Sequence, residues 1–186
     1  NEAPSEFVAL LDVGGGVTNV HIIKDGVPYF TRDLPIGVAQ FTEEFQKQLG
    51  LTYDTAQEVA RGHTDDVDQQ LVMDIVRSVG SEIYQGLEPS LSYLKTAGEA
   101  DGIDRIVLSG GGARLPYLAG YIEERLGVPV EIDTGLGQDQ VRLPKECDEE
   151  FDYAPYKIAV GLATQGLEIS PLEVNFLSAE IIAMRG

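Results

Sequence analysis

The chain has 186 residues, enough for one domain with a full hydrophobic core. Its 13 Lys and Arg against 31 Asp and Glu give a formal charge of −18, so no basic face for nucleic acid is expected. The single cysteine, Cys147, excludes an internal disulfide framework and a cysteine zinc site. No run approaches the ~20 apolar residues of a spanning helix, and the polar residues 1–6 are interpreted as a linker without a signal peptide.

Three short strands are predicted first, over 7–13, 17–24 and 27–33. The second and third are joined by a hairpin turn in which Gly26 takes the position that needs positive φ. The chain therefore opens with an antiparallel meander.

A glycine turn separates the first two strands: Asp12 is followed closely by Gly14, Gly15 and Gly16. These glycines can take positive φ and direct several backbone N–H groups at one spot, which would hold a phosphate. The Asp12 carboxylate beside them suits a Mg²⁺ ion held through its water shell. A glycine-rich turn without a ligand is an equally good interpretation of this pattern alone.

Helical spacing begins after residue 37. Apolar residues four apart predict a helix that ends at Gly50, and Thr52 caps a short helix over 53–61. A long apolar stripe predicts a helix from Val67 to Lys95, which Pro89 is expected to kink or divide.

The second half alternates strands and helices, so we predict an α/β fold with a mixed sheet and flanking helices. A buried strand over 105–109 leads into a second glycine turn, and Pro116 starts a helix that ends at Gly127. The remaining predicted elements are a strand over 128–132, a surface loop over 133–152, a helix over 154–166 and a tail over 167–186.

The second glycine turn consists of Gly110, Gly111 and Gly112 and lies between a buried strand and a helix. Ligands bind at such carboxyl ends of strands in open α/β sheets. Its glycines let the backbone lie flat against a base or ribose. One turn for phosphate and another for adenosine favour a nucleotide site over two unrelated turns.

The segment Asp12–Thr18 resembles the second phosphate motif of the actin-like ATPase superfamily, and Ile106–Pro116 resembles its adenosine motif. Ala159–Ala163 resembles a later connecting helix. The chain is thus similar to the second half of an actin-like (ribonuclease H-like) fold over residues 7–166. On this resemblance, residues 37–68 correspond to a reduced inserted subdomain.

Within that superfamily the chain is most similar to the group of FtsA and the type IV pilus protein PilM, through Thr18–Val20, Phe30–Asp33 and Gly110–Pro116. The resemblance implies a cytoplasmic scaffold of type IV pilus or type II secretion assembly. It would lie peripheral to the inner membrane through a bitopic, PilN-like partner, without inserting directly, and it could form homo-oligomers. The alternatives are an ATPase or sugar kinase of the superfamily and an FtsA-like cell-division filament protein.

The resemblance also implies the site residues. The first phosphate loop of the superfamily lies in the other half of the fold, so ATP and Mg²⁺ are expected only where that half is present. Gln57 and Ala60 replace the usual glutamate and lysine, and Asn19 replaces the histidine of actin, so no catalytic residue is assigned and at most a weak ATPase is expected. The implied cofactor-binding residues are Asp12 (also for Mg²⁺, through water), Gly14, Gly15, Gly16, Thr18, Gln57, Arg61, Gly110, Gly111, Gly112 and Arg114.

Overall fold

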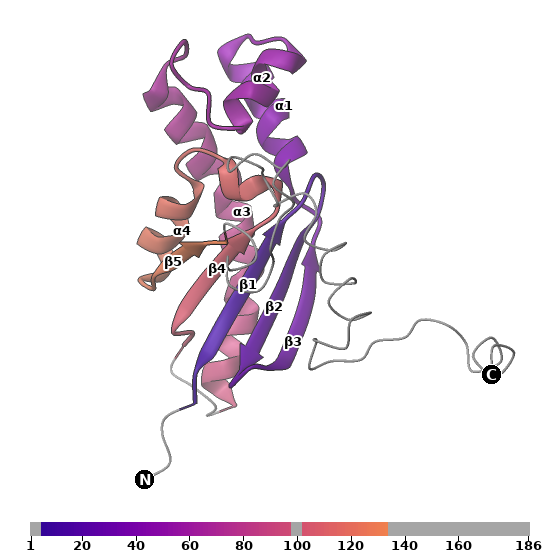
Figure 1. Ribbon diagram of the computed structural model, residues 1–186, viewed down its shortest axis with the longest axis vertical. Coiled ribbons are helices and arrows are strands. Elements are labelled where there is room, and N and C mark those ends of the chain that lie inside the picture. The colour runs from indigo at the N-terminus through magenta and orange to yellow at the C-terminus, as the bar shows by residue number, and fades with distance from the viewer. Residues whose placement is uncertain (1–4, 98–101, 134–186) are drawn as a thin grey trace, which may run out of the picture. The chain divides into compact units, whose positions relative to one another are not determined.

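The computed structural model describes residues 5–97 and 102–133. Five strands form one sheet in the order β3-β2-β1-β4-β5 (Figure 1). β1 pairs antiparallel with β2, and β2 with β3, whereas β4 lies parallel to β1 and β5 parallel to β4. The predicted mixed sheet is confirmed. The strands are β1 (Phe7–Val13), β2 (Thr18–Lys24), β3 (Val27–Leu34), β4 (Arg105–Ser109) and β5 (Val130–Ile132).

Both hairpin turns follow from local chemistry. Between β2 and β3, Asp25 and Gly26 take φ of 51° and 79°, the left-handed pair that matches the twist of the flanking strands. Between β1 and β2, the Gly14 N–H donates to the Val17 carbonyl at 2.9 Å and closes the tip at Gly15 and Gly16. The predicted antiparallel meander is therefore present.

Four α-helices and one 3₁₀ turn accompany the sheet in the described residues. Gly50 ends the first helix in the left-handed conformation, and the Thr52 hydroxyl caps the second by accepting from the Thr55 N–H. Asp68 caps the long third helix. The elements are α1 (Val38–Leu49), α2 (Tyr53–Ala60), α3 (Gln69–Thr96), the 3₁₀ turn η1 (Gly111–Arg114) and α4 (Leu118–Leu126).

Two helix predictions need correction. Of the two outcomes predicted at Pro89, the division is wrong and the kink stays a prediction: α3 continues through Pro89, because buried residues on both sides, such as Leu87 and Leu94, keep the helix packed on the core. α4 does not start at Pro116 but two residues later, because Tyr117 takes a left-handed conformation with φ of 62° before the helix begins. The residues predicted as a loop beyond Asp133, the helix over 154–166 and the tail over 167–186 lie outside the described residues.

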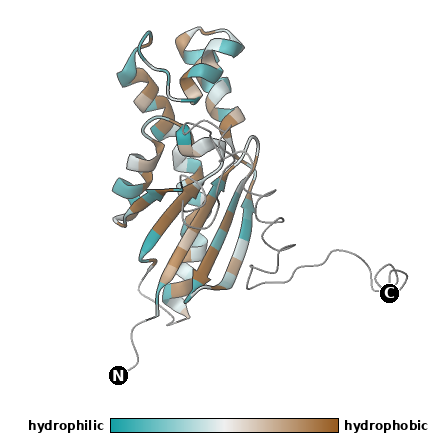
Figure 2. Ribbon diagram, viewed as in Figure 1, coloured by the Kyte–Doolittle hydropathy of each residue, from teal (hydrophilic) through white to brown (hydrophobic). Residues whose placement is uncertain are grey.

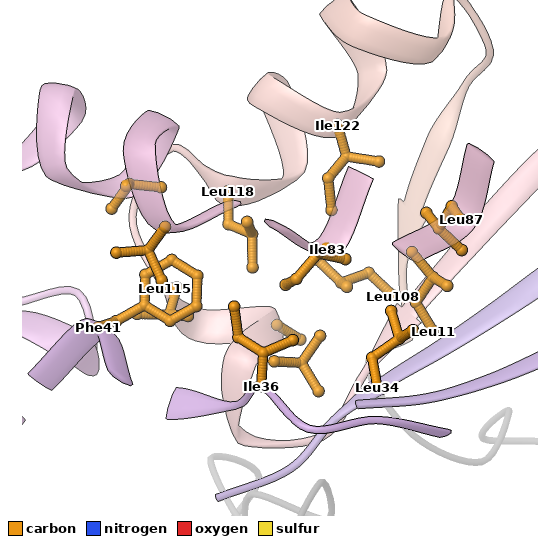
Figure 3. Close-up of a cluster of buried hydrophobic side chains, with 14 of the residues drawn as sticks. Leu11, Leu34, Ile36, Phe41, Ile83, Leu87, Leu108, Leu115, Leu118 and Ile122 are labelled. Carbon is orange, nitrogen blue, oxygen red and sulfur yellow. The ribbon is translucent and has the colours of Figure 1, made fainter. Parts of the chain in front are cut away.

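The core lies between the sheet and the helices. Alternate residues of β1 (Phe7, Ala9, Leu11 and Val13) are buried, as expected for one face of a strand. Figure 1 shows α3 running behind the sheet, and Figure 2 shows hydrophobic residues concentrated along β1 and β4. In Figure 3 side chains of the sheet and of α3, such as Leu108 and Ile83, lie close to Ile36, which precedes α1, and to Leu115, which follows η1. The core therefore extends to the start of α1 and to the end of η1.

Phe41 on α1 is fully buried in this core, whereas Tyr93 on α3 is 59% exposed. Replacing Phe41 with alanine should therefore lower the free energy of unfolding by about 3–5 kcal/mol through the lost burial and the cavity left behind. Tyr93→Ala, the matched control, should change it by less than about 0.5 kcal/mol. Urea unfolding followed by circular dichroism measures both, and equal losses would contradict the packing described.

Candidate functional site

The two glycine turns lie next to each other, at the carboxyl ends of two neighbouring inner strands. β1 and β4 are parallel neighbours, with Asp12 in register with Ser109. Each strand runs directly into its glycine turn, so the register places the two turns side by side. The sheet topology thus brings together two motifs that are far apart in the sequence.

The first turn is held by the start of α1. The N–H groups of Val38 and Ala39 donate to the carbonyls of Gly14 and Gly15 at 2.9 and 2.8 Å. In a planar trans peptide the carbonyl of one residue and the N–H of the next point in opposite directions, and the described peptide bonds are all trans. The N–H groups of Gly15 and Gly16 therefore point away from α1, and both residues are exposed.

The sequence analysis attributed the three glycines of the first turn to a need for positive φ, and this prediction is wrong. None of Gly14, Gly15 and Gly16 has a positive φ. The turn is shaped instead by close approach of another glycine: a Cβ on Gly37 would lie 2.5 Å from the Gly14 oxygen and 2.7 Å from the Gly16 nitrogen. Only a residue without a side chain lets the two backbones meet, and sequence analysis did not single out Gly37.

The glycines of the second turn divide into two roles. Gly110 has a φ of 76°, and a Cβ on it would collide with the Asp12 carboxylate. A Cβ on Gly112 would collide with the side chain of Val13, so both residues serve the packing of η1 on β1. Gly111 is exposed, and a Cβ there would meet only a Val38 methyl group, at 3.7 Å.

A cleft of about 250 Å³ lies between these elements. It collects five of the predicted site residues from three separate segments: Gly15, Gln57, Arg61, Gly111 and Arg114. Val38, Thr42 and Ala60 complete the lining. Val38 and Thr42 are four apart on α1 and so share a face, but the sequence alone did not indicate that this face borders the glycine turns. The predicted residues that do not line the cleft are Asp12, Gly14, Gly16, Thr18, Gly110 and Gly112.

The α2 side of the cleft carries polar side chains, and neighbouring residues hold them in place. The Gln57 amide donates to the Tyr53 hydroxyl at 2.8 Å, and Arg61 forms an ion pair with Glu58. Arg114 adds a second guanidinium to the lining. Two guanidinium groups and one side-chain amide therefore border the cleft as hydrogen-bond donors, and the charge of Arg61 is balanced by Glu58.

Thr18 and Asp12 lie beside the cleft in supporting positions. The Thr18 hydroxyl is buried and donates to the Ile36 carbonyl at 2.8 Å, so it fixes the segment that leads into α1. Asp12 is half-buried next to Gly110. Over residues 5–97 and 102–133 there is no group of three or more His, Cys, Asp or Glu side chains that could hold a metal ion. A lone carboxylate fits Mg²⁺ held mainly by water and a ligand, not by a protein cage.

Comparison with known proteins assigns the family. The profile described as "Type IV pilus assembly protein PilM" matches residues 1–167. The chain belongs to the PilM family. Its fold is the actin-like fold, and the predicted kinship with the PilM and FtsA group is confirmed.

Similar proteins support this assignment. The solved structure of a PilM-PilN type IV pilus biogenesis complex is 26% identical, with a TM-score of 0.69, and the match covers 91% of this chain and 48% of that chain. The cell division protein FtsA of Borreliella burgdorferi is 25% identical, and the match covers 72% of this chain and 39% of that protein. MreB 5 of Spiroplasma citri, solved with AMPPNP, shares the fold with a TM-score of 0.57 at 19% identity, covering 70% of this chain and 49% of that chain. The chain thus spans less than half the length of these relatives.

The two roles of the second-turn glycines can be separated by substitution. Gly112→Ala should lower the free energy of unfolding by about 1–3 kcal/mol, because the new methyl group overpacks against Val13 on β1. Gly111→Ala is the matched control and should leave stability nearly unchanged. Urea unfolding measures both variants, and a Gly112→Ala protein as stable as Gly111→Ala would contradict the packing of η1 on β1.

Proposed function

We propose that this chain forms one side of an ATP-binding cleft in a PilM-like scaffold of type IV pilus assembly. The observation that carries the proposal is the cleft itself, which unites residues of both glycine turns with Gln57 and Arg61 of α2. The actin-like fold supports it, since MreB 5 of Spiroplasma citri was solved with a nucleotide analogue bound.

Each group in the cleft has a chemical role in this proposal. The outward N–H groups of Gly15 and Gly16 donate to phosphate oxygens. The exposed backbone of Gly111 lies against the nucleoside, and the guanidinium groups of Arg61 and Arg114 stack on the base. The Gln57 amide hydrogen-bonds a ribose hydroxyl. Asp12 would hold Mg²⁺ through water, and the ion would neutralise phosphate charge.

This side of the cleft is built for binding, not for hydrolysis. None of the described lining residues is a carboxylate or a histidine, so this wall carries no general base for an attacking water. Asn19, which stands where actin has a histidine on the resemblance above, donates to Asp33 at 2.8 Å. ATP therefore acts as a structural ligand in this proposal, and the whole protein is at most a weak ATPase.

The partner and location follow from the family. The relative of known structure forms a complex with PilN. We extend this arrangement to the present chain, as a cytoplasmic component held at the inner membrane by a PilN-like bitopic protein. In the part of the chain that the structure describes, no helix combines the length and hydrophobicity needed to cross a membrane. A type II secretion platform is the related system in which the same role would apply.

The first test is Mg-ATP binding by calorimetry, on this chain and on the whole protein that carries it. Because the chain spans less than half of its relatives, we expect binding by the whole protein and much weaker binding by the chain alone. Chelating Mg²⁺ should weaken binding by the whole protein, since the phosphate charge is then left uncompensated. Absence of binding by the whole protein would refute a structural ATP ligand.

Gly111→Val tests the placement of the nucleoside. The side chain would project from the exposed turn into the cleft, so ATP binding should be abolished while the melting temperature stays within a few degrees of wild type. Gly120→Val is the matched control, because Gly120 is exposed on α4 and has no atom within 4 Å of a built Cβ. Calorimetry and thermal unfolding measure both, and unchanged affinity in Gly111→Val would remove this turn from the site.

A further inference from the structure

The segment that enters α1 is tied down through almost every polar backbone group. The Gln40 side chain, in the first turn of α1, accepts from the Gly37 N–H at 2.9 Å and donates to the Pro35 carbonyl at 3.3 Å. The Gly37 carbonyl accepts from the Gln40 N–H. Thr18 binds the Ile36 carbonyl, and the Ile36 N–H donates to Leu34.

This arrangement changes what the helix start does. The first N–H groups of a helix normally lack partners and attract anions directly. Here those of Val38 and Ala39 are occupied by the carbonyls of Gly14 and Gly15. These hydrogen bonds polarise the peptide groups that follow Gly14 and Gly15. The positive charge at the helix N-terminus therefore makes the Gly15 and Gly16 N–H groups, which belong to those peptides, stronger donors to an anion.

We infer that Gly37 and Gln40 are positioning residues for phosphate recognition, although neither lines the cleft. Gly37 lets α1 reach the turn, and Gln40 holds Gly37 in the extended conformation from which α1 starts. Together they fix the direction in which the Gly15 and Gly16 N–H groups project. The inference rests on the proposed function, because it assigns residues to the phosphate end of the same cleft.

Gln40→Leu is the decisive variant, since it keeps a side chain of similar size and leaves the Gly37 N–H and the Pro35 carbonyl without their partner. In the whole protein, ATP affinity should fall by about tenfold, the order expected for loss of oriented hydrogen bonds to a charged group. Adenosine affinity should stay within about twofold, because Gln57, Arg61 and Arg114 lie on other elements. Gln46→Leu on the same helix is the control and should change neither affinity.

Amide hydrogen exchange followed by NMR gives a readout that needs no nucleotide. In wild type, the Val38 and Ala39 amides should exchange slowly and those of Gly15 and Gly16 fast. Gln40→Leu should speed exchange at Val38 and Ala39, while buried positions of α3 such as Ile83 stay protected.

The two measurements separate the possible failures. If Gln40→Leu loosens α1 but lowers ATP and adenosine affinity equally, or neither, the positioning role is overturned. If exchange at Val38 and Ala39 is fast in wild type, the hydrogen bonds from these two amides to the first glycine turn do not hold, and the inference fails. If wild type binds no ATP while the exchange pattern is as expected, the proposed function fails, and the role in phosphate recognition fails with it. The hydrogen bonds between α1 and the first glycine turn would then have a structural role only.

Discussion

Backbone hydrogen bonds between the first glycine turn and the start of α1 connect the sheet to its helical layer. Val38 and Ala39 donate to Gly14 and Gly15, and Gly37 makes this approach sterically possible. The contact fixes the α1 face that presents Val38 and Thr42 to the cleft. It also sets the direction of the exposed N–H groups in the turn. The α1 part of the cleft wall and the N–H donors of the first turn therefore depend on one junction that consists almost entirely of backbone.

The same residue type does different work in the two turns. In the second turn, Gly110 and Gly112 are required because their neighbours are Asp12 and Val13 of β1, and only Gly111 faces the cleft. In the first turn, Gly15 has open space around it and contributes a polar group instead of a close contact. A glycine cluster thus combines positions that are fixed by packing with positions that are available to a ligand.

Much of the fold could be predicted because its signals are local. β2 alternates buried and half-buried residues, and turns such as Asp25–Gly26 and caps such as Thr52 are set by neighbouring residues. Some of the errors occurred where distant contacts decide the outcome. Burial of Leu87 and Leu94 carries α3 through Pro89. The start of α4 was misplaced for a local reason, because the left-handed conformation of Tyr117 has no signal in the sequence. Gly37 was missed because its partner turn, Gly14 to Gly16, lies 21 to 23 residues earlier, and no single-sequence pattern reveals such an approach.

The lining of the cleft also bears on why a nucleotide would be retained without hydrolysis in the proposed function. Backbone N–H groups and guanidinium groups bind the phosphates and the adenine ring, but they take no proton from water. A ligand that contacts both halves of a fold stabilises the arrangement in which the two halves face each other, by an amount set by its concentration and affinity. This wall offers hydrogen-bond donors but no general base. In the proposed function its chemistry is therefore suited to a ligand that holds the two halves of the fold together. Under the proposed function, this wall needs no general base, because a structural ligand has to stay bound and does not have to be turned over.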